Sequence, residues 1–200
     1  MSDDLYKTIA APSEGVYVEK RSRFIAVALP VCTPEQVKQQ LDAYRKQYYD
    51  ARHICYAYVL GSERSLFRSS DDGEPSGTAG KPILGQLNSH ELTDVLLLVV
   101  RYFGGIKLGT SGLITAYRAA ASRALAAALI QEKTVDETLT VFFEYPLMNE
   151  VMRIVKEMEP CIAEQSYNHT DCRMVLSIRR SLMPLLRERL GKVETLRLVE

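Results

Sequence analysis

The amino-acid sequence predicts an α+β protein of two domains, an α/β domain over residues 1–133 and a ferredoxin-like βαββαβ domain over residues 134–200. Three observations carry this prediction. Strand-like and helix-like patterns alternate from Val16 onward, a polar stretch at 131–137 interrupts them, and the patterns after that stretch form a βαββαβ series of their own. The second domain is expected to contain strand 138–145, helix 146–158, strands 162–168 and 172–178, helix 181–190 and strand 195–199.

The first domain opens with a strand and a surface helix. A mostly apolar run that ends at Pro30 predicts one strand over 16–29. Thr33 fits an N-cap with Pro34 at the first helical position, and apolar residues at helical spacing predict a helix that extends to about Tyr48. The remaining expected elements are a hairpin of strands 53–60 and 65–68, a helix over 81–90, a strand over 95–100 and a helix from 110 or 111 to about 128.

The strand expected over 95–100 is the most apolar segment of the chain. Its sequence, Val-Leu-Leu-Leu-Val-Val, is too short for a typical helix and favours a central strand that is buried on both faces. The helix that follows is rich in alanine, and Leu113, Tyr117 and Ala120 recur at helical spacing. We therefore expect a long helix that packs closely on the sheet.

Composition excludes several classes of protein. Hydrophobic residues make up 46% of the chain and charged residues 25%, which favours a packed core and argues against disorder. Basic and acidic residues number 25 each, so any binding to an anionic partner must depend on a local patch. The N-terminus lacks the pattern of a signal peptide, and the longest apolar run, 124–130, is too short to span a bilayer. We expect a cytoplasmic protein without a membrane partner.

The cysteines indicate neither a disulfide framework nor a zinc site. Cys32, Cys55, Cys161 and Cys172 are scattered without a C-x-x-C pair, and the chain has only three histidines. Buried, reduced thiols are the expected state.

A polar loop over 69–80 is the first candidate for a functional segment. Three glycines permit positive φ and close approach of the backbone, while Asp71, Asp72 and Glu74 concentrate negative charge. These carboxylates are candidates for metal ligands or for contacts with a basic partner. The alternative is ordinary turn chemistry, with Ser76 or Thr78 capping the next helix.

A second glycine-rich loop, over 101–112, lies between the buried strand and the start of a helix. Backbone N–H groups at a helix start attract anions, the glycines allow a phosphate to approach, and Arg101 and Lys107 add positive charge. The P-loop pattern fails, because Thr110 stands where its lysine is required, and the G-x-S-x-G pattern fails as well. Ser111 is expected to be an N-cap rather than a nucleophile.

His53 is a candidate for an acid or base. It follows Arg52 at the start of an expected strand, and its ordinary pKa near neutrality would make it useful if the two loops line a cleft. A hydrogen-bonded structural histidine is the competing interpretation.

Three motifs resemble one known family. They are DARH at 50–53, SDDGEPSGTAGKP at 70–82 and VVRYFGGIKLG at 99–109. Together they closely resemble the IMPACT family, specifically its bacterial YigZ-type members, and the resemblance covers about 16–129. The second domain is similar to the small C-terminal domain of those bacterial members.

The resemblance implies a fold for each domain and a role related to translation. It implies that the first domain resembles the second domain of a small-subunit ribosomal protein, and that the second resembles a ferredoxin-like domain of elongation factor G. Eukaryotic relatives regulate translation by competing for a coactivator of a starvation-responsive kinase. That partner does not carry over to a bacterial-type chain, and fold likeness alone supplies no reaction.

Three hypotheses of function follow. The first is a non-enzymatic, translation-related regulator that binds RNA, the ribosome or a translation factor through a cleft between the 69–80 and 101–112 loops, without a cofactor and without specificity for a DNA sequence. The second is an enzyme that acts on a phosphorylated or nucleotide-like ligand, with His53 as acid or base. The third is a protein–protein interaction module. The candidate binding residues are Arg52, Asp71, Asp72, Glu74, Thr78, Lys81, Arg101, Tyr102, Gly104, Gly105, Lys107, Gly109 and Ser111.

Overall fold

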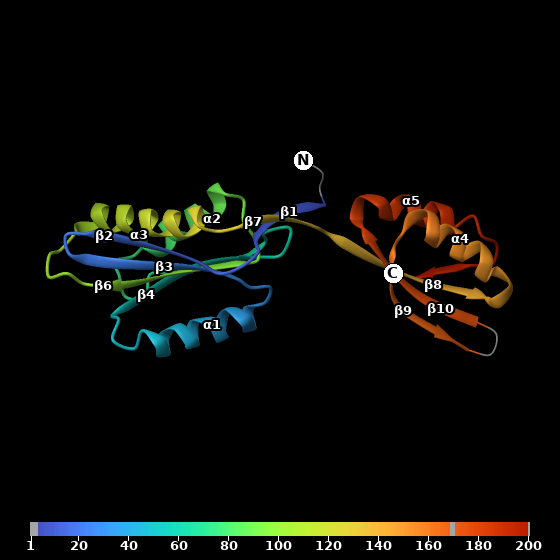
Figure 1. Ribbon diagram of the computed structural model, residues 1–200, viewed down its shortest axis with the longest axis horizontal. Coiled ribbons are helices and arrows are strands. Elements are labelled where there is room, and N and C mark those ends of the chain that lie inside the picture. The colour runs from blue at the N-terminus through green and yellow to red at the C-terminus, as the bar shows by residue number, and fades with distance from the viewer. Residues whose placement is uncertain (1–3, 169–170, 200) are drawn as a thin grey trace. The chain divides into compact units, whose positions relative to one another are not determined.

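The computed structural model describes residues 4–168 and 171–199, and its contacts divide the chain into two units (Figure 1). The first unit comprises Tyr6–Lys133. The second comprises residues 134–199 together with residues 4 and 5, which the sequence analysis assigns to the first domain. Each unit has a sheet and a hydrophobic core of its own.

The first unit is a five-stranded antiparallel sheet between two layers of helices. Its strands are β2 (Ser13–Glu19), β3 (Ser22–Pro30), β4 (His53–Leu60), β5 (Leu66–Ser70) and β6 (Val95–Tyr102), and its helices are α1 (Pro34–Gln47), α2 (Gly80–Ser89) and α3 (Gly109–Ala126). The strand order is β2-β3-β6-β4-β5. The helices α2 and α3 cover one face and α1 covers the other (Figure 1). Two further strands, β1 (Leu5–Ile9) and β7 (Ile130–Thr134), pair in a separate two-stranded sheet.

The prediction of a central strand is confirmed. The strand β6 lies between β3 and β4, and Val95–Val100 are fully buried because helices cover both faces of the sheet. The prediction for α1 is also confirmed, since the side chain of Thr33 accepts the N–H of Gln36 and Pro34 opens the helix.

The single strand expected over 16–29 is wrong, because the chain reverses within it. Lys20 and Arg21 both have positive φ, 45° and 66°, and they connect β2 to β3 as the turn of a tight hairpin. Glycine and asparagine are the residues typical of such a turn, and this turn contains neither. The sequence therefore does not mark it.

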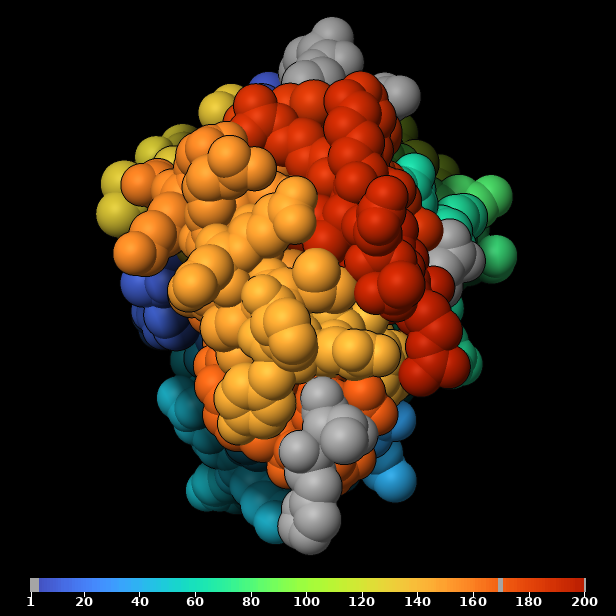
Figure 2. Space-filling model, turned by 90° about the vertical axis from the view of Figure 1, so that its right-hand side faces the viewer, coloured from blue at the N-terminus to red at the C-terminus, as the bar shows by residue number. Residues whose placement is uncertain are grey.

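The second unit has the ferredoxin-like fold that the sequence predicts. Its elements are β8 (Asp136–Glu144), the 3-10 turn Tyr145–Leu147, α4 (Met148–Met158), β9 (Cys161–Tyr167), β10 (Asp171–Arg179), the 3-10 turn Arg180–Leu182, α5 (Met183–Leu190) and β11 (Arg197–Val199). The antiparallel sheet has the order β11-β8-β10-β9. The inward residues of β8 and β10 form one core with α4 and α5. Figure 2 shows this unit in space-filling form, with α5 and β11 in red.

Two of the four cysteines differ from expectation. All four are free thiols, but Cys32 and Cys161 are exposed whereas Cys55 and Cys172 are buried. In the part of the chain that the structure describes, no helix is long and apolar enough to cross a membrane.

Asp4 joins the start of the chain to the second unit. It is 1% exposed, and its carboxylate accepts Nε and Nη2 of Arg179 at 2.6 and 3.0 Å and the N–H of Ser181 at 3.2 Å. The hydrogen bond from Arg179 is the main cause that holds the pKa of Asp4 well below its ordinary value. The ionised carboxylate is therefore the form that stabilises this unit.

We expect Asp4→Asn to destabilise the second unit at neutral pH. Because the pKa of Asp4 is lower in the folded than in the unfolded protein, its stabilising effect is complete above the ordinary value near 3.8 and is lost as the pH falls through the lowered pKa. Hydrogen exchange of amides in β8 and β10 across a pH series measures the stability of this unit. The control is Asp42→Asn, at an exposed position of α1. Equal protection of wild type and Asp4→Asn at pH 7 would contradict the role assigned to Asp4.

Candidate functional site

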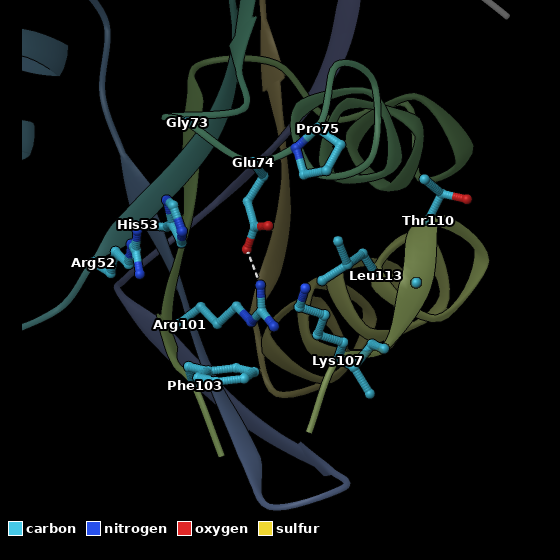
Figure 3. A pocket seen from close by; sticks show the side chains of 12 residues that line it. Arg52, His53, Gly73, Glu74, Pro75, Arg101, Phe103, Lys107, Thr110 and Leu113 are labelled. Atoms are coloured by element: carbon cyan, nitrogen blue, oxygen red, sulfur yellow. Dashed lines mark hydrogen bonds and ion pairs between the residues drawn. The ribbon is translucent and has the colours of Figure 1, made fainter. Parts of the chain in front are cut away.

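Four segments of the first unit meet at one pocket of about 440 Å³ (Figure 3). They are the start of β4, the middle of the 69–80 loop, the end of β6 with the loop after it, and the first turn of α3. The lining residues are Arg52, His53, Gly73, Glu74, Pro75, Arg101, Phe103, Lys107, Leu108, Gly109, Thr110 and Leu113. The structure thus brings the two loops together at one place.

Asp71 anchors the first loop to the start of α2. Its Oδ1 accepts the N–H groups of Ala79 and Gly80 at 3.0 and 2.8 Å, and its Oδ2 accepts the N–H of Gly77 at 2.8 Å. Burial acts to raise the pKa of Asp71, but the three backbone donors together outweigh it and hold this pKa below its ordinary value. The carboxylate therefore caps the helix from the preceding loop.

The alternative interpretation, in which Ser76 or Thr78 caps α2, is wrong. The N-cap position is Ala79, which has no side-chain cap, and the hydroxyl of Thr78 donates instead to the carbonyl of Pro75 at 2.6 Å. The helix start needs no nearby hydroxyl because Asp71 already accepts its N–H groups.

A turn at Asp72 and Gly73 ties the same loop to β4. Both residues have positive φ, 43° and 86°. Asp72 Oδ2 accepts the N–H of Ile54 at 2.7 Å, and the Asp72 carbonyl lies 2.8 Å from Nδ1 of His53. Because a carbonyl only accepts, Nδ1 carries the proton in this hydrogen bond, and Nε2 is the ring atom left to act at the pocket.

Glu74 turns inward from the loop and forms a buried ion pair with Arg101. The two side chains are 4% and 8% exposed. Arg101 Nη1 and the hydroxyl of Tyr117, the latter at 2.8 Å, both donate to Glu74 Oε1. The Cys55 thiol lies 3.0 Å from the carbonyl oxygen of Asp71, which can accept its hydrogen, and 3.3 Å from the Tyr117 oxygen. Burial is the main cause that raises the pKa of the Tyr117 hydroxyl. Burial likewise raises the pKa of the Cys55 thiol to about 12. Both groups therefore stay protonated at neutral pH.

Arg101 is held in place from several sides. In the sheet it pairs with His53 of β4 on one side and with Phe24 of β3 on the other. Its Cζ lies 5.5 Å from the ring centroid of Phe24 and 5.7 Å from that of Phe103. Its Nε has no hydrogen-bond partner in the described part of the chain. The guanidinium is therefore fixed in orientation but not saturated with acceptors.

Gly104 allows the second loop to leave the sheet close to the turn between β2 and β3. A Cβ atom at this position would lie 2.0 Å from the backbone carbon of Arg21, so only glycine fits. The N–H of Gly104 donates to Ser22 Oγ at 3.2 Å. With the loop start fixed in this way, the Lys107 side chain extends into the pocket (Figure 3).

The helix α3 begins at the pocket wall. Its N-cap, Leu108, offers no side-chain hydrogen bond, so the partial positive charge of the helix start is not neutralised by a cap. The expectation that Ser111 caps this helix is wrong. Ser111 lies inside the first turn, where its carbonyl accepts the hydroxyl of Thr115 at 3.0 Å.

The pocket has a surplus of positive charge. Arg52, Arg101 and Lys107 line it, and Glu74 is the one carboxylate among its described lining residues. Since Arg101 compensates Glu74, the charges of Arg52 and Lys107 remain. Such a pocket suits an oxyanion.

The sequence-predicted residues divide into those that line this pocket and those that do not. Those it brings together are Arg52, His53, Glu74, Arg101, Lys107 and Gly109. Asp71, Asp72 and Thr78 form hydrogen bonds that shape the first loop, and Tyr102 donates to Asp50 at 2.8 Å. Lys81 and Ser111 line two smaller neighbouring pockets, and Gly104 and Gly105 belong to the second loop but are not among the described lining residues of these three pockets.

Sequence reasoning missed six lining residues. They are Gly73, Pro75, Phe103, Leu108, Thr110 and Leu113. The one available signal was the presence of two large apolar side chains, Phe103 and Leu108, inside a glycine-rich loop.

The carboxylates of Asp71 and Glu74 are engaged in hydrogen bonds within the protein. Within residues 4–168 and 171–199, no group of three or more His, Cys, Asp or Glu side chains could hold a metal ion. Both oxygens of Asp71 accept backbone N–H groups, and Oε1 of Glu74 accepts Arg101 and Tyr117.

Comparison with known proteins gives consistent matches. Residues 20–125, which include every lining residue of the pocket, match the family model of the Impact N-terminal domain. The chain is 34% identical to the IMPACT family member YvyE of Bacillus subtilis, over 82% of this chain and 75% of that protein. It is 37% identical to YigZ of Escherichia coli, over 79% and 78%. A solved structure of a hypothetical protein is 31% identical, with a TM-score of 0.76 over 98% of this chain and 97% of that one.

We expect Glu74→Ala to lower the free energy of unfolding by about 3 to 5 kcal/mol, because it leaves the buried Arg101 without its counter-charge. Urea unfolding followed by circular dichroism measures the change. The double variant Glu74→Gln with Arg101→Met should lose less than the single variant, since it removes both charges. A loss below about 1 kcal/mol for Glu74→Ala would show that the ion pair does not hold the loops together.

The four thiols should fall into two classes of reactivity. Cys32 and Cys161 are exposed and should react with an aromatic disulfide reagent at pH 8 in the folded protein. Cys55 and Cys172 should react only after unfolding, since burial raises the pKa of both thiols. Fast reaction of Cys55 in the folded protein would contradict the closed network around Tyr117.

Proposed function

Because the chain belongs to the IMPACT family, we propose that it is a translation-related regulatory protein that binds an RNA-containing partner through the pocket between the 69–80 and 101–112 loops. The observation that carries this proposal is the convergence of the two loops on one pocket with surplus positive charge.

The arrangement of the charges favours phosphates as the recognised groups. Arg52 and Lys107 are exposed at the pocket, so both are accessible to a partner. Lysine and arginine supply most protein contacts to the nucleic-acid backbone, and such contacts do not depend on base sequence. This supports binding without specificity for a particular sequence.

Apolar side chains beside these cations suit single-stranded RNA. Phe103 lines the pocket and is 54% exposed, and Ile106 of the same loop is 45% exposed. An exposed aromatic ring next to a basic groove gives an unpaired base a surface on which to stack.

Further basic residues surround the first turns of α3. Lys81 and Arg118 line a neighbouring pocket between α2 and α3, and Lys20 lines another next to Leu108. Among the described residues that line these two pockets, the one carboxylate is that of Glu19, which accepts the hydroxyl of Tyr17 at 3.1 Å. These three cations would therefore contact further phosphates of a bound strand beyond the main pocket.

The translation-related part of the proposal rests on the family. The resemblance implies that eukaryotic members regulate translation, and that each domain resembles a domain of the translation machinery. The resemblance leaves RNA, the ribosome or a translation factor open as the partner, and the charge of the pocket favours a partner that contains RNA.

Binding of a labelled single-stranded RNA in filter assays should weaken as salt rises from about 50 to 200 mM, with a slope of about 0.7 per phosphate neutralised. Lys107→Glu should weaken binding about tenfold or more and lower the slope by about 1. The matched control is Lys38→Glu, an exposed lysine of α1 on the opposite face of the sheet, which should leave affinity unchanged.

Two outcomes would count against this function. Affinity that does not respond to salt would remove phosphate recognition, and equal weakening by Lys107→Glu and Lys38→Glu would remove the pocket as the binding surface. Co-sedimentation of the same three proteins with ribosomes checks the translation-related part separately.

A further inference from the structure

We propose that the pocket recognises a phosphate monoester, at the end of an RNA chain or on a free nucleotide, rather than an internal phosphodiester. This inference rests on the proposed function, because it specifies which anionic group enters the same pocket.

The first argument is the position of Arg101. Its side chain is 8% exposed, it lines the pocket, and its Nε has no hydrogen-bond partner among the residues described. Glu74 occupies only one edge of the guanidinium. An oxyanion that reached the bottom of the pocket would give this guanidinium a second acceptor.

The second argument is access. An internal phosphodiester continues into sugar on both sides, so a running strand keeps it at the rim, away from a side chain as buried as Arg101. A terminal phosphate, by contrast, can enter with its free oxygens first. The volume of about 440 Å³ is within the usual range for pockets that hold small ligands of nucleotide size.

The third argument is charge. After Arg101 compensates Glu74, Arg52 and Lys107 leave two positive charges at the pocket. A phosphate monoester carries about −1.5 to −2 at pH 7, which matches that surplus, whereas a diester carries about −1.

The fourth argument is the start of α3, which adds backbone donors. Gly109 and Thr110 line the pocket, and no side chain caps this helix of 18 residues. A helix start with glycine beside it binds phosphate through its N–H groups. Figure 3 shows Lys107 and Arg101 extending toward the same space from the side opposite Pro75.

The remaining wall suits the organic part of such a ligand. Pro75, Phe103, Leu108 and Leu113 are apolar residues of the lining, and Figure 3 shows Pro75 and Phe103 on opposite sides of the pocket. A sugar or base attached to the phosphate would lie against these side chains, and a base could stack on Phe103. Inorganic phosphate, which lacks this part, should bind more weakly than a nucleotide.

The experiment compares RNA oligomers of one sequence with a 5′-phosphate, a 3′-phosphate or hydroxyl groups at both ends, using the full chain. We expect at least one phosphorylated oligomer to bind about tenfold more tightly than the hydroxyl form. Adenosine 5′-monophosphate should compete for the site, adenosine should not, and inorganic phosphate should compete less well than the nucleotide.

Variants locate the effect. Arg52→Gln and Lys107→Gln are exposed positions that should fold normally, and each should abolish the preference for a phosphorylated end. Lys38→Gln should keep it.

The outcomes separate this inference from the proposed function. If the phosphorylated and hydroxyl RNAs bind with equal affinity and Lys107→Glu weakens the binding of both, recognition of a terminal phosphate is overturned. RNA binding at the pocket then remains in place. Binding of the nucleotide without binding of any RNA would support the monoester with a free nucleotide as its source, and would overturn RNA binding. Binding of neither would overturn both.

Discussion

The buried ion pair between Glu74 and Arg101 is the interaction on which the candidate site depends. It joins a residue of the first loop to the end of the central strand, and the hydroxyl of Tyr117 adds a third element, α3. A charge this deeply buried is tolerated only when it is paired and hydrogen-bonded. The same pair also determines the electrostatic character of the pocket, because it compensates Glu74, the one carboxylate among the described lining residues, and leaves the charges of Arg52 and Lys107.

The first loop illustrates how the role of a charged segment changes on folding. In the sequence it is the most acidic candidate segment, and its carboxylates favour a cation or a basic partner. In the structure Asp71 accepts three backbone N–H groups, Asp72 accepts the N–H of Ile54, and Glu74 accepts Arg101. Each carboxylate therefore stabilises the loop or its attachment to the sheet. The loop contributes its shape to the pocket, while the positive charge comes from other segments.

Much of the fold and part of the site could be predicted from the sequence. The apolar run at β6 and the βαββαβ series gave strong periodic signals, and the two loops were identified by glycine and charge. The turn at Lys20 and Arg21 could not be found, because neither residue type favours positive φ. The capping of α2 by Asp71 was missed because the acceptor lies eight and nine residues before its donors, outside any local capping pattern. The pairing of Glu74 with Arg101 spans 27 residues and depends on tertiary packing, which periodicity does not encode.

The attachment of Asp4 to Arg179 has a consequence for the order in which the protein can fold during synthesis. The two partners are separated by 175 positions, and the whole of the first unit is translated between them. The first unit can complete its sheet once residues up to Lys133 have been synthesised. Asp4 can form its ion pair only after Arg179 has been synthesised as well. The second unit is in this sense discontinuous, with the first unit inserted into it. Asp4 therefore precedes the whole first unit in the sequence but reaches its native partner only after that unit has been synthesised.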